Sequence, residues 1–176
     1  QSVPIETTLA VPGIRSTQAV WLDMIRSARK TIDFEEFYLV GSPGKALDPV
    51  VQAISDAAKR GVKIRFVIDS KFFKTYPDMP NAFNKLANVE VRVIDLGPGI
   101  QHSKYFIVDQ TEVFEGSANF DWLALTHIHE VGLRISDPGI AGALGSGRDR
   151  EVALAKTIKT SGRPMDYALN RRARYT

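Results

Sequence analysis

One segment of this 176-residue chain constrains its fold more than any other, the run from Asp48 to Asp69. Apolar residues first recur there at helical spacing, Gly61 ends the helical pattern, and the apolar strand pattern Val62–Asp69 follows directly. A helix that passes through a glycine straight into an apolar strand is typical of a crossover packed on a sheet. We therefore expect an α/β protein in which helices cover a sheet.

The rest of the chain continues this alternation of helix and strand, without an internal repeat. A helix is expected after the cap Ser16 or Thr17, and the segment Lys71–Pro80 is expected to be a loop. A last helix is expected from Asp137 to about Lys159, interrupted at the glycines of residues 145–147. Further strands are expected at residues 31–40, 89–95, 104–108, 113–115 and 130–136. Together these elements predict a mixed β-sheet sandwiched between helices on both faces.

Length and composition indicate one domain but do not identify a partner. Residues 1–159 suffice for one domain with its own core, and residues 160–176 are expected to form a basic extended tail or linker. The net charge of +3 is compatible with a polyanionic substrate without requiring one. The absence of cysteine excludes disulfides and thiolate metal sites, and no apolar run reaches the roughly 20 residues of a membrane span. The compartment is not determined, because the absence of cysteine suits an exported protein as well as a cytosolic one, and the start at Gln1 fits either a removed leader or a trimmed chain. Of the two, export is favoured over the cytoplasm.

A second feature carries chemistry, because His102, Lys104 and Asp109 follow the pattern His-x-Lys-x4-Asp. His102 and Lys104 are two residues apart on an incoming strand, so their side chains face the same side and place an imidazole beside a cation. Chance would produce such a match in a chain of this length about once in a hundred. The run Gly116-Ser-Ala-Asn119 and then Glu130 follow near the ends of later strands.

This set of residues supplies the groups that can move a phosphoryl group without a metal. They are a histidine nucleophile, a carboxylate that orients a histidine, and a lysine and an amide that hold an oxyanion. Gly116 permits a tight bend and close approach of backbones, after which Ser117 and Asn119 present a hydroxyl and an amide at one strand end. The alternative, a surface His–Lys pair without function, does not account for the downstream Gly-Ser-Ala-Asn run.

The run His102-Ser-Lys-Tyr-Phe-Ile-Val-Asp109, followed by Gly116-Ser-Ala-Asn-Phe-Asp-Trp122, resembles the signature of the phospholipase D superfamily. The stretch Gly116–Thr126 followed by Glu130-Val-Gly132 is especially similar to the branch that holds the endolysosomal 5′-exonucleases and related bacterial proteins. The resemblance extends more loosely through Ser16–Asp69 and reaches about Leu144. It implies the phospholipase D-like fold.

The resemblance also implies a role for each matching residue. His102 corresponds to the histidine that attacks phosphorus and forms a phosphohistidine, and Lys104 and Asn119 correspond to residues that hold the non-bridging oxygens. Ser117 corresponds to the hydroxyl that supports the phosphate site. Glu130 corresponds to the carboxylate that hydrogen-bonds a catalytic histidine and sets its tautomer. This chemistry uses no metal and no cofactor.

Asp109 and Gly116 correspond to structural rather than catalytic positions of the same motif. Glu115, directly before Gly116, departs from the family pattern, which usually has a small or apolar residue there. Its negative charge would oppose a substrate phosphate, and strand alternation favours a side chain that faces away from the site. The pair Glu35 and Glu36 is unusual within an apolar strand, and a structural role is favoured over a catalytic one.

The chemistry requires a second copy of the motif. A nucleophilic histidine must be neutral, whereas the leaving oxygen needs a proton from a charged group, and one imidazole cannot do both at once. The family brings two motifs together at a pseudo-two-fold axis, but this sequence has one, because His127 and His129 lack a following x-Lys. We therefore expect the second motif from a homodimer mate, as in small single-motif bacterial endonucleases, or from a missing half of the same protein. His127 and His129 are expected to be surface or interface residues rather than metal ligands.

Substrate class is the least determined property. We predict a metal-independent phosphodiesterase that hydrolyses DNA or RNA, because the chain is mildly basic and the segment Lys71–Tyr76 mixes lysines with aromatic residues that can stack on bases. Within that segment the expected substrate contacts are Lys71, Phe73, Lys74 and Tyr76. A phospholipase or phosphatidyl transferase that acts on phospholipid headgroups is the alternative enzyme. A non-catalytic phosphate-binding half-domain is the alternative from another class.

Overall fold

The computed structural model describes residues 1–158, so the expected tail at residues 160–176 lies outside the described residues. The strands of the main sheet are β1 (Thr31–Glu36), β3 (Lys63–Asp69), β4 (Val89–Ile94), β5 (Tyr105–Val108), β6 (Glu112–Gly116), β8 (Gly132–Ser136) and β9 (Lys156–Thr157). A second, two-stranded sheet consists of β2 (Leu39–Val40) and β7 (Phe120–Asp121). The helices are α1 (Thr17–Ser27), α2 (Asp48–Lys59), α3 (Ser70–Thr75), α4 (Asp78–Phe83), α5 (Trp122–Thr126) and α6 (Pro138–Leu154).

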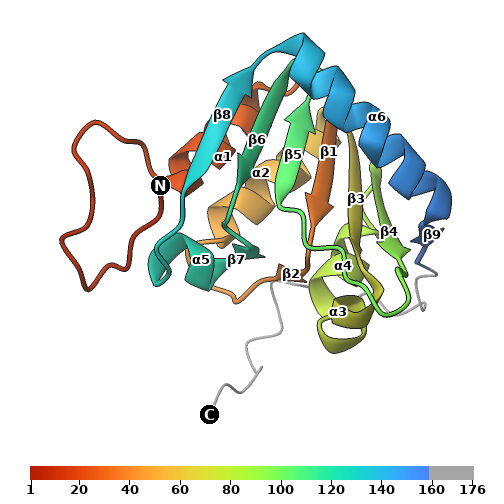
Figure 1. Ribbon diagram of the computed structural model, residues 1–176, viewed down its shortest axis with the longest axis horizontal. Coiled ribbons are helices and arrows are strands. Elements are labelled where there is room, and N and C mark those ends of the chain that lie inside the picture. The colour runs from red at the N-terminus through yellow and green to blue at the C-terminus, as the bar shows by residue number, and fades with distance from the viewer. Residues whose placement is uncertain (159–176) are drawn as a thin grey trace.

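The main sheet is mixed, as predicted, with the strand order β8-β6-β5-β1-β3-β4-β9. Strands β1, β3 and β4 are parallel to one another, while β5 runs antiparallel to β1, and β6 and β8 continue the antiparallel part. Helix α2 makes the crossover from β1 to β3 that the glycine junction at Gly61 predicted. Figure 1 shows α6 across one face of the sheet and α1 and α2 behind the other, so the predicted helix–sheet–helix sandwich is confirmed.

The main core lies between the sheet and helices α1, α2 and α4. Alternate residues along each strand point to this face, so the aromatic rings of neighbouring strands stack in register. The Phe34 and Phe66 rings, for example, lie 4.4 Å apart at 7°. The largest fully buried side chains of this core include Trp21, Phe34, Phe66, Phe106, Phe120, Met24 and Ile25.

The opposite face carries a smaller apolar cluster and a buried ionic contact with α6. Asp33 on β1 accepts hydrogen bonds from Arg65 at 2.6 and 2.9 Å, and Arg148 of α6 approaches it to 3.4 Å. The predicted interruption at residues 145–147 is wrong, because α6 runs unbroken from Pro138 to Leu154. A glycine costs a helix only about 1 kcal/mol, and packing of Ala141 into the smaller apolar cluster of Tyr105, Ile107 and Val113 offsets that cost.

Three other predicted elements differ in the structure. The first strand ends at Glu36, and Leu39–Val40 joins the second sheet instead. The expected loop 71–80 holds α3 and the start of α4, because Asp69 caps α3 by accepting hydrogen bonds from the backbone N–H groups of Lys71 and Phe72. The last strand of the antiparallel part begins at Gly132, and Glu130 only forms an isolated backbone pair with Ser2. Within residues 1–158 no helix is long and apolar enough to cross a membrane.

Candidate active site

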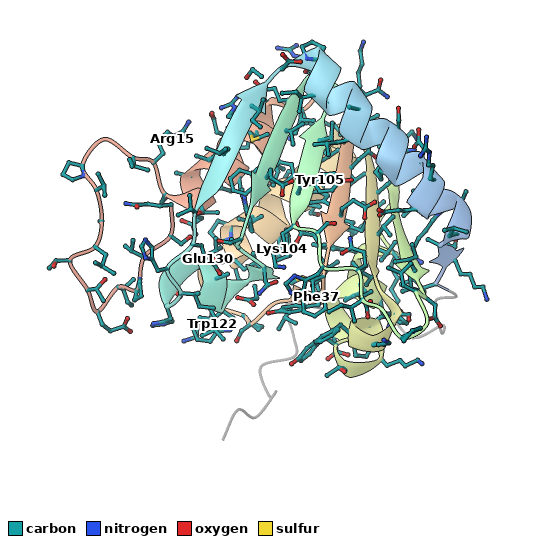
Figure 2. The ribbon with its side chains drawn as sticks, in the orientation of Figure 1. Arg15, Phe37, Lys104, Tyr105, Trp122 and Glu130 are labelled. Atoms are coloured by element: carbon teal, nitrogen blue, oxygen red, sulfur yellow. The ribbon has the colours of Figure 1, made fainter. Side chains whose placement is uncertain are left out.

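The predicted catalytic residues gather at one end of the main sheet, beside β2, β7 and α5. Figure 2 shows Lys104, Glu130 and Phe37 close to this end, with Tyr105 further along the sheet. His102 lies in the loop that leads into β5, and Lys104 directly precedes that strand. Ser117 and Asn119 lie between β6 and β7.

Gln101 fastens the loop that carries His102. Its backbone N–H donates to Asp69 Oδ2 at 2.9 Å, and its side-chain amide donates to Glu35 Oε2 at 2.8 Å. Its side-chain oxygen accepts from the backbone N–H of Ser103 at 2.7 Å. The buried glutamine therefore fixes both sides of His102. This role could not be predicted from the sequence, because Asp69 and Glu35 are far from Gln101 along the chain and come close to it only when β1 and β3 pair in the sheet.

Lys104 and His102 form the centre of the site. The buried Lys104 Nζ lies 3.0 Å from His102 Nδ1 and 3.3 Å from Nε2, and it donates to the His102 backbone carbonyl at 2.9 Å. Burial and the charge of Lys104 hold the pKa of His102 below its ordinary 6.5. His102 is exposed, so a neutral, nucleophilic imidazole faces solvent beside a fixed cation.

Carboxyl groups surround Lys104. Burial lowers the pKa of Lys104, and the negative charges of Glu36, Glu130 and Glu115 oppose that shift. Glu36 is fully buried, and burial raises its own pKa well above the ordinary value, while the positive charge of Lys104 opposes that rise. Strand alternation favoured a Glu115 that faces away from the site, yet its carboxylate lies within electrostatic reach of Lys104.

Ser117 and Glu130 are joined directly. The Ser117 hydroxyl donates to Glu130 Oε2, and it accepts from the backbone N–H of Val131 at 3.1 Å. No hydrogen bond joins Glu130 to His102 in residues 1–158. The side-chain oxygen of Asn119 is buried without a hydrogen-bond partner in this part of the chain. An unpaired buried oxygen of this kind is costly unless a further group or a ligand completes it.

Gly116 is required by close packing rather than by an unusual backbone angle. It lies opposite Gly132 in the β6–β8 register. A Cβ atom at Gly116 would lie 2.8 Å from the Val131 carbonyl oxygen and 2.9 Å from the Gly132 Cα. The strand end that carries Ser117 can therefore approach Val131 only because residue 116 has no side chain.

Asp109 occupies the other end of β5 from Lys104. Its carboxylate accepts from the backbone N–H groups of Lys30 at 2.7 Å, Thr31 at 2.9 Å and Arg29 at 2.9 Å. Burial alone would raise the pKa of Asp109, but these three N–H groups outweigh burial and lower it. The geometry fits a structural position, because the carboxylate ties the start of β1 to the end of β5.

The four predicted substrate contacts, Lys71, Phe73, Lys74 and Tyr76, do not share one environment in the structure. The Lys71 ammonium donates to the Pro98 and Gly99 carbonyls at 3.1 and 2.8 Å, so it fastens the loop before His102. Phe73 packs against the main core, and Lys74 is exposed in the last turn of α3. Tyr76 belongs to a row of rings that leads to His102.

Sequence reasoning missed the other members of that row. Phe72, rather than Phe73, faces the site, and its ring centroid lies 3.9 Å from that of Phe37. The Phe37 ring in turn lies 4.5 Å from the His102 ring and 5.5 Å from Lys104 Nζ. No pattern in the sequence could have selected Phe72, because the α3 helix that turns its ring toward Phe37 was predicted to be a loop.

His127 and His129 are not joined to this site by any described contact. His127 Nδ1 lies 2.7 Å from Glu6 Oε1, and its ring lies 5.5 Å from that of Trp122. His129 is exposed. Within residues 1–158 no group of three or more His, Asp or Glu side chains is arranged to hold a metal ion.

Comparisons with known proteins match the motif and the fold. The family model described as "Cardiolipin synthase, PLD-like domain" matches residues 21–146. The chain is 34% identical over 146 residues to "Phospholipase D Z" of Dictyostelium discoideum and 31% identical over 147 residues to "5'-3' exonuclease PLD3" of Rattus norvegicus. Both alignments cover 76% of this chain but only 34% and 30% of those proteins, so the chain spans about a third of their length.

The fold is also similar to that of a solved structure from the same family. The crystal structure of a phospholipase D family member, Nuc from Salmonella typhimurium, superposes with a TM-score of 0.69 at 28% identity. The superposition covers 82% of this chain and 91% of that one. Since the family match spans most of the chain and contains the His102–Asp109 motif, this chain belongs to the phospholipase D-like family, within a superfamily of phosphodiesterase hydrolases.

Proposed function

We propose that this chain is a metal-independent phosphodiesterase that hydrolyses DNA or RNA through a phosphohistidine on His102. The observation that carries the proposal is the position of the Lys104 ammonium, 3.0 Å from the ring of an exposed His102. A cation beside the ring favours the neutral, nucleophilic imidazole and can also hold a non-bridging phosphate oxygen.

In the proposed reaction, a ring nitrogen of His102 attacks phosphorus and the bond to the leaving oxygen breaks. Lys104 and Asn119 hold the non-bridging oxygens, and Ser117 supports the same phosphate. A protonated histidine of the second motif gives its proton to the leaving oxygen. That histidine, now neutral, then takes a proton from water, which attacks the phosphohistidine and releases His102. In the assembled site Glu130, which the Ser117 hydroxyl holds, accepts a hydrogen bond from one of these two histidines and sets its tautomer.

The second motif comes either from a homodimer mate or from a second half of one longer protein. Nuc, of which this chain covers 91%, supports a homodimer mate, because a family member of similar length exists. The curated relatives, of which it covers about a third, support a second half within one longer protein. The oligomeric state of an active preparation separates these two sources.

Nucleic acid is the proposed substrate because of the aromatic rings beside His102, the net charge of +3 and the similarity to a protein named as an exonuclease. Similarity to a protein named as a phospholipase D favours the alternative, hydrolysis of phospholipid headgroups.

The test is cleavage of single-stranded DNA, double-stranded DNA, RNA and phosphatidylcholine vesicles, each in EDTA. We expect nucleic-acid cleavage that EDTA does not abolish. We also expect a phosphoenzyme that is stable in base and labile in acid, and that is absent from the His102→Asn variant. Lipid cleavage alone would replace the nuclease proposal by the phospholipase alternative. No cleavage by a confirmed dimer would favour a phosphate-binding half-domain.

A further inference from the structure

Four aromatic side chains form a continuous row that ends on His102, and we call Phe37, Tyr38, Phe72 and Tyr76 the aromatic row. The centroid of the Phe37 ring lies 4.5 Å from that of the His102 ring and 3.9 Å from that of the Phe72 ring. Tyr38 lies 5.9 Å from Phe72, with only 24° between the ring planes, and 5.6 Å from Tyr76. Rings from the segment after β1 and from α3 thus meet at the catalytic histidine.

Exposure rises along the row with distance from His102. Phe37 is 8% exposed, Tyr38 and Phe72 are half-buried, and Tyr76 is 38% exposed. Phe37 is therefore the buried member of the row, and the other three rings present surface to solvent. Exposed aromatic surface that adjoins a reacting group is typical of a binding site rather than of a core.

The rings are held in place by bonds that also position the catalytic residues. The Tyr38 hydroxyl donates to Asp121 Oδ2 at 2.6 Å, and Asp121 lies two residues after Asn119. Asp69 caps the helix that carries Phe72 with one carboxylate oxygen, while its other oxygen accepts from Gln101, next to His102. The row and the phosphate site therefore keep a fixed geometry, which reduces the entropy lost when a ligand binds.

Trp122, the other large ring labelled at this end in Figure 2, is less suited to stacking. The Lys45 ammonium lies 4.7 Å from the Trp122 ring centroid, and His127 meets the same ring edge-on at 5.5 Å. A cation thus already lies over the Trp122 ring, whereas Tyr38, Phe72 and Tyr76 contact other aromatic rings and keep part of their surface exposed.

From this arrangement we propose that Tyr38 and Phe72 form a stacking platform for an unpaired nucleobase next to the phosphate that His102 attacks. The proposal rests on the proposed nuclease function and deepens it. Flat π-faces held near a phosphate site suit a base of any sequence, because every base presents such a face. A base within a duplex is already stacked and paired, so the platform selects single-stranded nucleic acid. Tyr38 and Phe72 are specificity-determining residues that leave the phosphoryl chemistry to His102 and Lys104.

The experiment uses the full chain and single-stranded oligonucleotides that are identical except for one abasic residue, placed in turn at each position around the cleaved bond. The variants Tyr38→Leu and Phe72→Leu remove a ring but keep apolar volume. Their matched controls, Tyr38→Phe and Phe72→Tyr, keep the ring. Leu154→Ala, at the exposed end of α6, is the control for an unrelated surface change. A 2-aminopurine base at the preferred position reports stacking by its fluorescence.

For wild type we expect kcat/KM to fall about tenfold when the abasic residue lies at one position beside the cleaved bond. That ratio should approach one in both leucine variants, and it should persist in Tyr38→Phe, Phe72→Tyr and Leu154→Ala. Fluorescence quenching of 2-aminopurine should follow the same division between variants.

Three results would overturn the platform. If wild type cleaves the abasic and complete oligonucleotides equally, the nuclease function stands and the platform is wrong. If the leucine variants lose stability but keep the wild-type ratio, the rings are merely structural. If wild type cleaves phosphatidylcholine vesicles and no oligonucleotide, both the nuclease function and the platform fail, and the row faces lipid.

Discussion

Substitution of Asp109 tests whether the aspartate of the motif stabilises the fold or takes part in catalysis. Its carboxylate accepts three backbone N–H bonds, from Lys30 and Thr31 on one oxygen and from Arg29 on the other. Asp109 also has a φ of 51°, in the left-handed region that asparagine tolerates and alanine does not. The variants Asp109→Asn and Asp109→Ala therefore remove different parts of the same contact.

The expected losses follow from the bonds removed. Asn keeps one oxygen for Lys30 and Thr31 but turns an amide toward the Arg29 N–H, so one charge-assisted bond is lost at about 2 kcal/mol. Ala loses all three bonds and adds backbone strain, for about 4 kcal/mol in total. For a domain of this size 1 kcal/mol lowers Tm by roughly 2–4 °C, so Asn should lower Tm by about 4–8 °C and Ala by about twice as much.

The measurement is thermal unfolding across pH, together with cleavage at a temperature where every variant is folded. The folded-state pKa of Asp109 lies below its ordinary 3.8, so its stabilisation is present above that pH and is lost as the pH falls through the lowered value. The difference in Tm between wild type and Asp109→Asn should therefore disappear below pH 3.8. Asp56→Asn, whose carboxylate bonds only the exposed side chains of Gln52 and Lys59, should change stability little.

A structural role also predicts that folded Asp109→Asn keeps a kcat within a few-fold of wild type. An unchanged Tm with a kcat reduced a hundredfold or more would refute the reasoning and place Asp109 in the chemistry.

Further predictions concern the site and its support. Gly116→Ala should destabilise the fold by about 2 kcal/mol or more, because its Cβ would lie 2.8 Å from the Val131 carbonyl oxygen; an unchanged urea midpoint would contradict this. In an NMR titration His102 should have a pKa below 6.5, and Lys104→Gln should raise it, because the neighbouring positive charge disfavours the imidazolium; no change in the variant would remove that cause. Glu35 is buried against Glu151 and has a pKa of about 9, above its ordinary 4.5, so wild type should lose stability as pH rises from 4.5 toward 9. Glu35→Gln should flatten that part of the stability curve measured by urea unfolding, and an equal slope in both proteins would show that Glu35 does not titrate there.

Much of the architecture could be predicted from local pattern. The parallel crossover through α2 was readable because Gly61 separates a helical from a strand period within a short run. The elements that were predicted wrongly depend on distant partners. Helix α6 stays continuous through its glycines because it packs along one face of the sheet, where Ala141 joins the smaller apolar cluster and Arg148 reaches Asp33, and α3 forms because Asp69 caps it. Neither partner can be identified from spacing alone.

The sequence by itself determined the family and the chemical groups of the candidate site. The spacing of His102, Lys104 and Asp109 is a local pattern, and strand geometry alone places the first two side chains together. Only the tertiary structure decided what surrounds them: the buried Glu36 within electrostatic reach of Lys104, the hydrogen bonds of Gln101 that hold the His102 loop, and the ring of Phe72 rather than Phe73 beside Phe37. The physical reason is that these contacts join residues far apart in sequence, whose distance and burial exist only once the strands have paired.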